Sequence, residues 1–187
     1  KNYAAEQCAG PWILSIDADE RVSPQLAAAI QHELAAPRFS AYRIARRSYF
    51  MNRWINHSGW YPDAKVRLWR KGVGRWGGYN PHDDVKVAGP VGELCGDIHH
   101  YVYRDVQHNL ETIARYSSIM ADELYRRGRR ARLWDLLFRP PLVFIKKLVL
   151  RLGMLDGRAG LVIALMSAYS SYAKYAKLWE RQREKRT

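Results

Sequence analysis

The sequence predicts a mixed α/β front part, residues 1–104, followed by a purely helical and strongly basic back part, residues 105–187. Two observations predict the front part: a short apolar run that leads into acidic residues and then a helix, and alternating strand-like segments further on. The third observation is the helical spacing of apolar residues from about position 105 onward. A length of 187 residues accommodates a single core with a helical appendage.

The first elements follow from local signals. Residues 2–9 are typical of a helix end, stopped by Gly10-Pro11. The apolar run 12–16 predicts a buried parallel strand, which places the acidic residues after it at the carboxyl end of that strand, where open α/β sheets bind ligands. Ser23 and Pro24 supply an N-cap and a first-turn proline for a helix that extends to about residue 35.

The remaining elements are expected from periodicity and from breaker residues. Residues 41–50 and 64–69 predict strands with an ordered loop between them, and the glycine-rich segment 72–84 predicts a loop. Three further helices are expected over residues 105–127, 133–152 with a break near Pro140, and 160–179.

The charge is concentrated at the C-terminal end of the chain. The chain carries 31 Lys and Arg against 18 Asp and Glu, a net charge of +13, and residues 126–187 hold 16 of the basic and four of the acidic residues. This excess indicates an anionic partner, and the abundance of apolar residues excludes a disordered tail. The two cysteines form no C-x-x-C pattern, so neither a zinc site nor a disulfide framework is indicated.

Asp17 and Asp19 are the sharpest chemical signal. Two carboxylates at positions i and i+2, after a buried strand where the chain turns, can converge on one Mg²⁺ or Mn²⁺ ion that keeps positions for phosphate oxygens. His100 is a candidate third ligand or phosphate contact. The alternative is that Asp17–Glu20 opens a loop and caps the next helix, and that His100 is structural.

Several aromatic and basic residues are candidates for substrate binding. Trp60 and Tyr61 have rings that can stack on sugars, although they also suit the core of a loop. Arg46, Arg67 and Arg70 can meet phosphates, but alternating arginines on strands more often belong to a solvated face.

The segment Trp12–Glu20 resembles the central strand and D-x-D motif of family 2 glycosyltransferases. Further segments strengthen the resemblance to the bacterial subgroup that builds the inner core of lipopolysaccharide: Arg53-Trp54-Ile55, Gly59-Trp60-Tyr61-Pro62-Asp63, Arg67-Leu68-Trp69-Arg70, Gly89-Pro90-Val91-Gly92 and His100-Tyr101. The resemblance covers nearly the whole chain. It implies a GT-A, Rossmann-like core without its first βαβ units, which in the family hold the nucleotide, and therefore a chain that is part of a longer protein.

The resemblance also implies a mechanism. A sugar would pass from a nucleotide-sugar donor to a glycolipid acceptor by a single inverting displacement, assisted by a cation bound through Asp19 and Asp17. The family usually has His-Glu where this chain has His82-Asp83, so Asp83 is expected to be the general base, with Asp84 in reserve. His82 and Asp63 are expected among the donor- and acceptor-binding residues.

The basic, apolar segment 139–152 predicts association with an anionic membrane surface. With a glycolipid acceptor, we expect a cytoplasmic protein bound peripherally to the inner face of the bacterial inner membrane. The alternative for this region is a helical hairpin whose basic residues are merely solvated. Alternatives for the whole chain are a non-catalytic remnant of such an enzyme, a metal-dependent phosphohydrolase, or a nucleic-acid-binding module. The last is disfavoured, because no nucleic-acid-binding signature is present.

Overall fold

The computed structural model describes residues 1–79, 82–103 and 105–184, except for the side chains of residues 78, 79, 82, 83 and 184. The chain divides into two compact units. The first comprises residues 1–49 and 61–102, and the second comprises residues 50–60 and 103–187. No helix among the described residues is long and apolar enough to cross a membrane.

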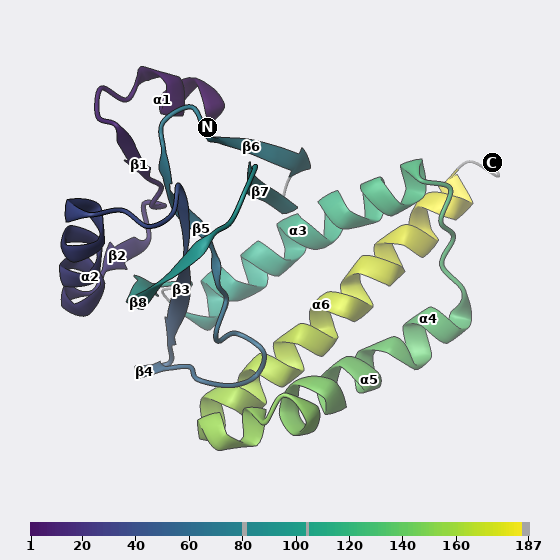
Figure 1. Ribbon diagram of the computed structural model, residues 1–187. Helices are drawn as coiled ribbons and strands as arrows, with labels where there is room; N and C mark the ends of the chain where they lie inside the picture. The colour runs from purple at the N-terminus through teal and green to yellow at the C-terminus, as the bar shows by residue number, and fades with distance from the viewer. Residues whose placement is uncertain (80–81, 104, 185–187) are drawn as a thin grey trace. The chain divides into compact units, whose positions relative to one another are not determined.

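The first unit is built on a mixed sheet. Its strands are β1 (Trp12–Leu14), β5 (Lys65–Arg70), β3 (Ala41–Phe50, whose last residue counts with the second unit), β8 (Gly92–His100) and β2 (Glu20–Val22), in that spatial order (Figure 1). β3 and β8 run parallel, and the other neighbouring pairs run antiparallel. The mixed α/β architecture is thus confirmed. The expected parallel arrangement of the first strand is wrong, because its partner in the described sheet, β5, runs the opposite way.

Two helices complete the first unit, α1 (Asn2–Gln7) and α2 (Pro24–Ala35). The Ser23 hydroxyl accepts a hydrogen bond from the Leu26 amide at 3.2 Å, as the predicted N-cap requires. The same hydroxyl accepts from the Asp97 amide at 3.2 Å, so the cap also ties α2 to β8. Gly96, at φ +94°, allows this approach, because a Cβ there would lie 2.5 Å from the Leu26 amide nitrogen.

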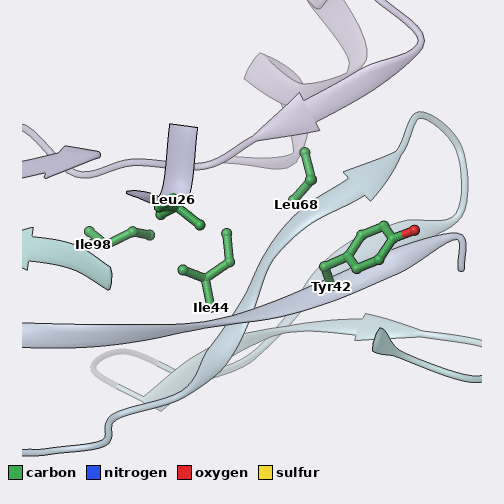
Figure 2. Close-up of a cluster of buried hydrophobic side chains, with 5 residues drawn as sticks. All are labelled: Leu26, Tyr42, Ile44, Leu68 and Ile98. Atoms are coloured by element: carbon green, nitrogen blue, oxygen red, sulfur yellow. The ribbon is translucent and has the colours of Figure 1, made fainter. Parts of the chain in front are cut away.

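The core of the first unit lies between α2 and the sheet. Leu26 projects from α2 toward side chains of β3, β5 and β8 (Figure 2), and the cluster is almost completely buried; its members are Leu26, Tyr42, Ile44, Leu68 and Ile98. The period-2 pattern of β3 supplies Tyr42 and Ile44 to this cluster.

Residues 72–84 are not the predicted loop. They contain most of a hairpin, in which β6 (Gly74–Tyr79) pairs antiparallel with β7 (His82–Val87). Trp76 and Val85 pack against Ile13, Ala41 and Trp69 in a second apolar cluster. Burial of these side chains stabilises the two strands, although the glycines in the sequence predict a loop.

The second unit is largely helical. It contains the short strand β4 (Arg53–Trp54) and helices α3 (Val106–Arg126), α4 (Leu133–Leu137), α5 (Arg139–Ile145) and α6 (Gly157–Glu184), with a π-helical turn η1 (Lys146–Leu150) and a 3₁₀ turn η2 (Gly153–Asp156). α6 lies between α3 and the α4–α5 pair (Figure 1). The break in the helix predicted over residues 133–152 falls at Phe138, before the prolines, because Pro140 is accommodated in the first turn of α5.

Asp156 fixes the loop segment of the second unit. Its carboxylate, 1% exposed, accepts hydrogen bonds from the amides of Asn56 at 3.1 Å and His57 at 3.0 Å, and from the Ser58 hydroxyl at 3.1 Å. The Ser58 amide donates to the Arg151 carbonyl at 2.8 Å, and Lys147 donates to the Ser58 carbonyl at 2.9 Å. Residues 50–60 are therefore held by η1, η2 and the turn between them.

Stability of the first unit should depend on acid pH through Glu33. The Arg38 guanidinium and the Tyr42 hydroxyl donate to this carboxylate, and they lower the pKa of Glu33 from 4.5 to about 2. Because the folded pKa is lower than the unfolded one, the contribution is complete above pH 4.5 and is lost as pH falls toward 2. Glu33→Gln should flatten the dependence of the unfolding free energy on pH in this window, measured by urea denaturation at a series of pH values. An unchanged slope would contradict the assignment.

Candidate functional site

The acidic segment between β1 and β2 forms a turn held by the backbone. The Glu20 amide donates to the Asp17 carbonyl at 3.0 Å, and the Tyr101 amide donates to the Asp19 carbonyl at 2.9 Å. The turn is therefore fixed against the end of β8. The side chains of Asp17 and Asp19 remain 45% and 50% exposed, so both carboxylates are accessible.

Glu20 is the buried centre of this site. Its side chain is fully buried, and its carboxylate accepts hydrogen bonds from Arg67 at 2.9 Å, from Arg46 at 3.3 Å and from the Asp17 amide at 2.9 Å. A buried carboxylate is tolerated when opposite charges and donors surround it. The arrangement joins the start of β2 to β3 and β5.

Arg67 connects this buried centre to the first aspartate. Both of its terminal nitrogens lie 3.4 Å from Oδ2 of Asp17, while its own side chain is only 5% exposed. The alternative of a solvated strand face is therefore wrong for Arg67. Its guanidinium bridges a buried and an accessible carboxylate, which fixes where Asp17 lies.

His100 contacts the second aspartate. Its Nε2 lies 3.2 Å from Oδ2 of Asp19, and its Nδ1 lies 3.4 Å from Oγ of Ser48. Burial, and then the nearby charge of Arg46, lowers the pKa of His100 below 6.5, so the ring is neutral at pH 7. Because a carboxylate only accepts, the single ring proton belongs on Nε2, and the free lone pair on Nδ1 faces the Ser48 hydroxyl. Through these two contacts, His100 orients the side chain of Asp19.

Two further predicted residues, Tyr61 and Asp63, lie in the first unit. The Arg46 guanidinium donates through Nε to Oδ2 of Asp63 at 3.0 Å, and the Arg46 amide donates to the Asp63 carbonyl at 3.2 Å. The Tyr61 hydroxyl donates to Oδ1 of Asp97 at 3.2 Å. Burial and the neighbouring Asp97 carboxylate raise the pKa of Tyr61. Arg46 thus binds both Glu20 and Asp63.

Other predicted residues lie elsewhere or outside the description. Arg70 lies over the Trp12 ring, 5.5 Å from its centroid. Asp84 is 64% exposed, and one of its oxygens is 3.8 Å from the ammonium of Lys65. The backbones of His82 and Asp83 pair in β7 with Tyr79 and Gly78, but their side chains lie outside the described residues.

Trp60 belongs to the second unit, where it lines a pocket of about 230 Å³. Its ring packs against those of Phe50 and Tyr103, with centroids 5.8 and 6.3 Å away. The lining combines aromatic, aliphatic and polar side chains: Trp60, Tyr103, Asn109, Ile113, Ile163, Met166, Ser167 and Ser170.

Sequence reasoning missed the roles of Glu20 and Ser48. Glu20 stood within the acidic motif, but nothing in the spacing distinguishes a buried carboxylate from a third exposed one. The available signal was the pair of arginines on two predicted strands, since buried arginines need a carboxylate partner.

Asp17 and Asp19 together offer two accessible carboxylates to a cation. Among the residues that the structure describes, no three His, Cys, Asp or Glu side chains are grouped so that they could hold a metal ion. Two carboxylates nevertheless fit Mg²⁺, which is commonly held by one or two carboxylates and completed by water and substrate phosphates.

The chain is similar to known bacterial proteins along nearly its whole length. A lipopolysaccharide core biosynthesis glycosyltransferase, LpsC, of Rhizobium meliloti is 30% identical over 185 residues, which are 97% of this chain and 68% of that protein. The chain belongs to this glycosyltransferase family. Uncharacterized glycosyltransferases of Rickettsia typhi and Rickettsia prowazekii are 26% and 25% identical over 96% and 95% of the chain.

This glycosyltransferase chain spans about two thirds of the length of these curated relatives, 68%, 66% and 65% respectively. No protein-family model matches it, and no solved structure is significantly similar to it. Because the similarity covers 97% of the chain, it extends over both units.

The buried centre of the site should carry a large share of the stability of the first unit. Glu20→Gln removes the charge that Arg46 and Arg67 share, and breaking a buried pair of this kind costs roughly 3 to 5 kcal/mol. The unfolding free energy from denaturant titration measures this loss. Asp19→Asn is the matched control, because its half-exposed carboxylate should contribute less than about 1 kcal/mol. Equal effects of the two substitutions would contradict the central role of Glu20.

Proposed function

We propose that this chain is the metal- and acceptor-binding part of an inverting glycosyltransferase of the GT-A type. It would transfer a sugar from a nucleotide-sugar donor to a glycolipid acceptor of the lipopolysaccharide-core type. The observation that carries the proposal is the acidic turn of this glycosyltransferase chain. Two accessible carboxylates, Asp17 and Asp19, lie in this turn, and Arg67 joins Asp17 to the buried Glu20.

Asp17 and Asp19 would hold a Mg²⁺ or Mn²⁺ ion. When bound, such an ion neutralises charge on the leaving diphosphate of the donor. Arg67 would set the position of Asp17, and neutral His100 would set the position of Asp19 through its Nε2–H. Because Arg67 is buried and the His100 side chain is only 12% exposed, the carboxylates would need little rearrangement when substrate arrives.

Asp83 would act as the general base. It would accept the proton of the acceptor hydroxyl as the new bond forms between that oxygen and the anomeric carbon, while the bond from that carbon to the diphosphate oxygen breaks. Asp83 belongs to β7, where its backbone pairs with that of Gly78 in β6. The departure of Asp83 from the family's usual glutamate shortens the reach of the carboxylate.

Aromatic residues of each unit, taken separately, would be candidates for contact with a sugar. Tyr61 lies in the same unit as the acidic turn, and Trp60 and Tyr103 line the pocket of the second unit, whose volume of about 230 Å³ suits a sugar ring. The Rhizobium relative is a lipopolysaccharide core biosynthesis glycosyltransferase by name, which supports an acceptor of this class. Such an acceptor would locate the enzyme at the inner face of the bacterial inner membrane.

Substitution of the acidic turn tests the cation site. Asp19→Ala should remove Mn²⁺ binding measured by isothermal titration and should lower sugar transfer by at least about a hundredfold, since a carboxylate ligand is lost. Chelation with EDTA should have the same effect on transfer, reversed by added Mg²⁺ or Mn²⁺. Glu93→Ala, an exposed carboxylate on β8, serves as the control and should change neither. Full transfer in EDTA would refute the cation site.

Substitution in β7 tests the base. Asp83→Asn keeps the shape but cannot accept the proton, so turnover should fall roughly 10²- to 10⁴-fold while donor affinity changes little. Asp84→Asn is the comparison, because Asp84 is 64% exposed beside Lys65 and should be nearly silent. Transfer is followed with UDP- and ADP-sugars on a lipopolysaccharide-core acceptor. The reverse pattern would assign the base to Asp84.

A further inference from the structure

The second unit exposes an unusual quantity of large apolar side chains. They lie in one continuous stretch from α4 to η2, where Trp134 is 69% exposed and Leu150 is 72% exposed. The members of this apolar surface are Leu133, Trp134, Leu137, Phe138, Leu142, Ile145, Val149, Leu150, Leu152, Met154 and Leu155. Contiguous exposed apolar residues are typical of a surface that binds a membrane or another protein.

The spacing shows that the apolar surface follows one helical face. Phe138, Leu142, Ile145 and Val149 recur at intervals of four, three and four residues along α5 and η1, so they share one side. α5 packs against α6, while these four side chains are 45% to 61% exposed. A helix on the surface of a water-soluble unit normally turns its polar side outward, and here the outward side is apolar.

The charged side chains around the apolar surface indicate what kind of partner it binds. Arg130, Lys146, Arg151 and Arg158 are exposed around the apolar stretch. Within residues 127–158, all of which the structure describes, the two acidic side chains are Asp135 and Asp156, and both are buried. The surface therefore presents cations beside apolar groups with no exposed carboxylate among them, which matches an anionic lipid headgroup layer above acyl chains.

An aromatic pair lies at the beginning of the stretch. The rings of Trp134 and Phe138 stack with centroids 4.7 Å apart and planes at 28°, and both side chains are largely exposed. Tryptophan rings favour the boundary between headgroups and acyl chains, because they combine an apolar body with one N–H donor.

We propose that α4, α5, η1 and η2 form a membrane-docking surface that inserts its apolar side chains into the headgroup boundary of an anionic bilayer. The surrounding arginines and lysines bind the lipid phosphates. A second copy of the chain is a poorer occupant, because an isologous contact would bring the same cations of both copies together. The proposal deepens the membrane location given in the proposed function by naming the surface and the lipid chemistry.

Vesicle sedimentation of the full chain tests this surface. The protein should bind vesicles of phosphatidylethanolamine and phosphatidylglycerol, and binding to phosphatidylcholine vesicles should be much weaker. The double variant Leu142→Glu/Leu150→Glu should reduce the partition coefficient by at least about tenfold, since two side chains lose their apolar burial. Ile119→Glu, on α3 and 38% exposed, is the matched control and should bind normally.

A second pair of substitutions tests the electrostatic part. Lys146→Gln and Arg158→Gln should each lower binding to the anionic vesicles roughly fivefold and should weaken the salt dependence. Circular dichroism and thermal melting check that every variant is folded. Unchanged vesicle binding by Leu142→Glu/Leu150→Glu overturns the proposal. The proposal is also overturned if light scattering shows that the protein self-associates and this variant abolishes the self-association while vesicle binding stays intact.

The test is independent of sugar transfer. Asp19→Ala, which should abolish cation binding, should bind vesicles like the unaltered protein. Normal vesicle binding without transfer would contradict the glycosyltransferase mechanism alone, and transfer to a water-soluble acceptor fragment without vesicle binding would contradict the docking surface alone.

Discussion

The first unit depends on a buried carboxylate that two arginines share. Glu20 begins β2, Arg46 lies on β3 and Arg67 lies on β5, so this one group connects strands that are distant in sequence. A charge that is fully buried is costly unless donors surround it, and here the donors also reach outward to Asp17 and Asp63. The same interaction that satisfies the buried charge therefore positions the accessible carboxylates of the acidic turn.

The second unit also contains a buried carboxylate that is stabilised by several hydrogen-bond donors. Asp156, almost fully buried in η2, binds two amides and a hydroxyl from residues 56–58. The segment 50–60 has little regular structure of its own, and its backbone donors would otherwise lose water without compensation. The consequence for function is that Trp60, the last residue of this segment, is held against Phe50 and Tyr103 at the aromatic pocket.

In the second unit, the side chains that hold the helices together are different from the apolar side chains exposed on the surface. Buried clusters around Ile55 and Ile163, and around Ala121 and Leu178, hold the helices together. The outward side of α5 and η1 adds nothing to these clusters, and its apolar side chains remain exposed. Because their exposure costs solvation free energy without benefit to the fold, they are better explained by a binding role than by packing.

The sequence by itself determined the elements whose signals are local. The cap at Ser23, the period of 41–50 and the apolar spacing after residue 105 predicted α2, β3 and α3, and the family resemblance identified a glycosyltransferase. It also placed Asp17 and Asp19 after the first strand, which ends at Leu14 in the structure, because position along the chain is enough for that.

Only the tertiary structure decided the features that depend on distant partners. The β6–β7 hairpin forms because Trp76 and Val85 pack against an apolar cluster from other strands. The glycines in residues 72–78 predict a loop there, because the sequence does not show this packing. The direction of β1 depends on β5, and the burial of Glu20 depends on arginines 26 and 47 residues away. Periodicity and capping are properties of neighbouring residues, whereas the burial of a charge depends on which strands the fold brings together.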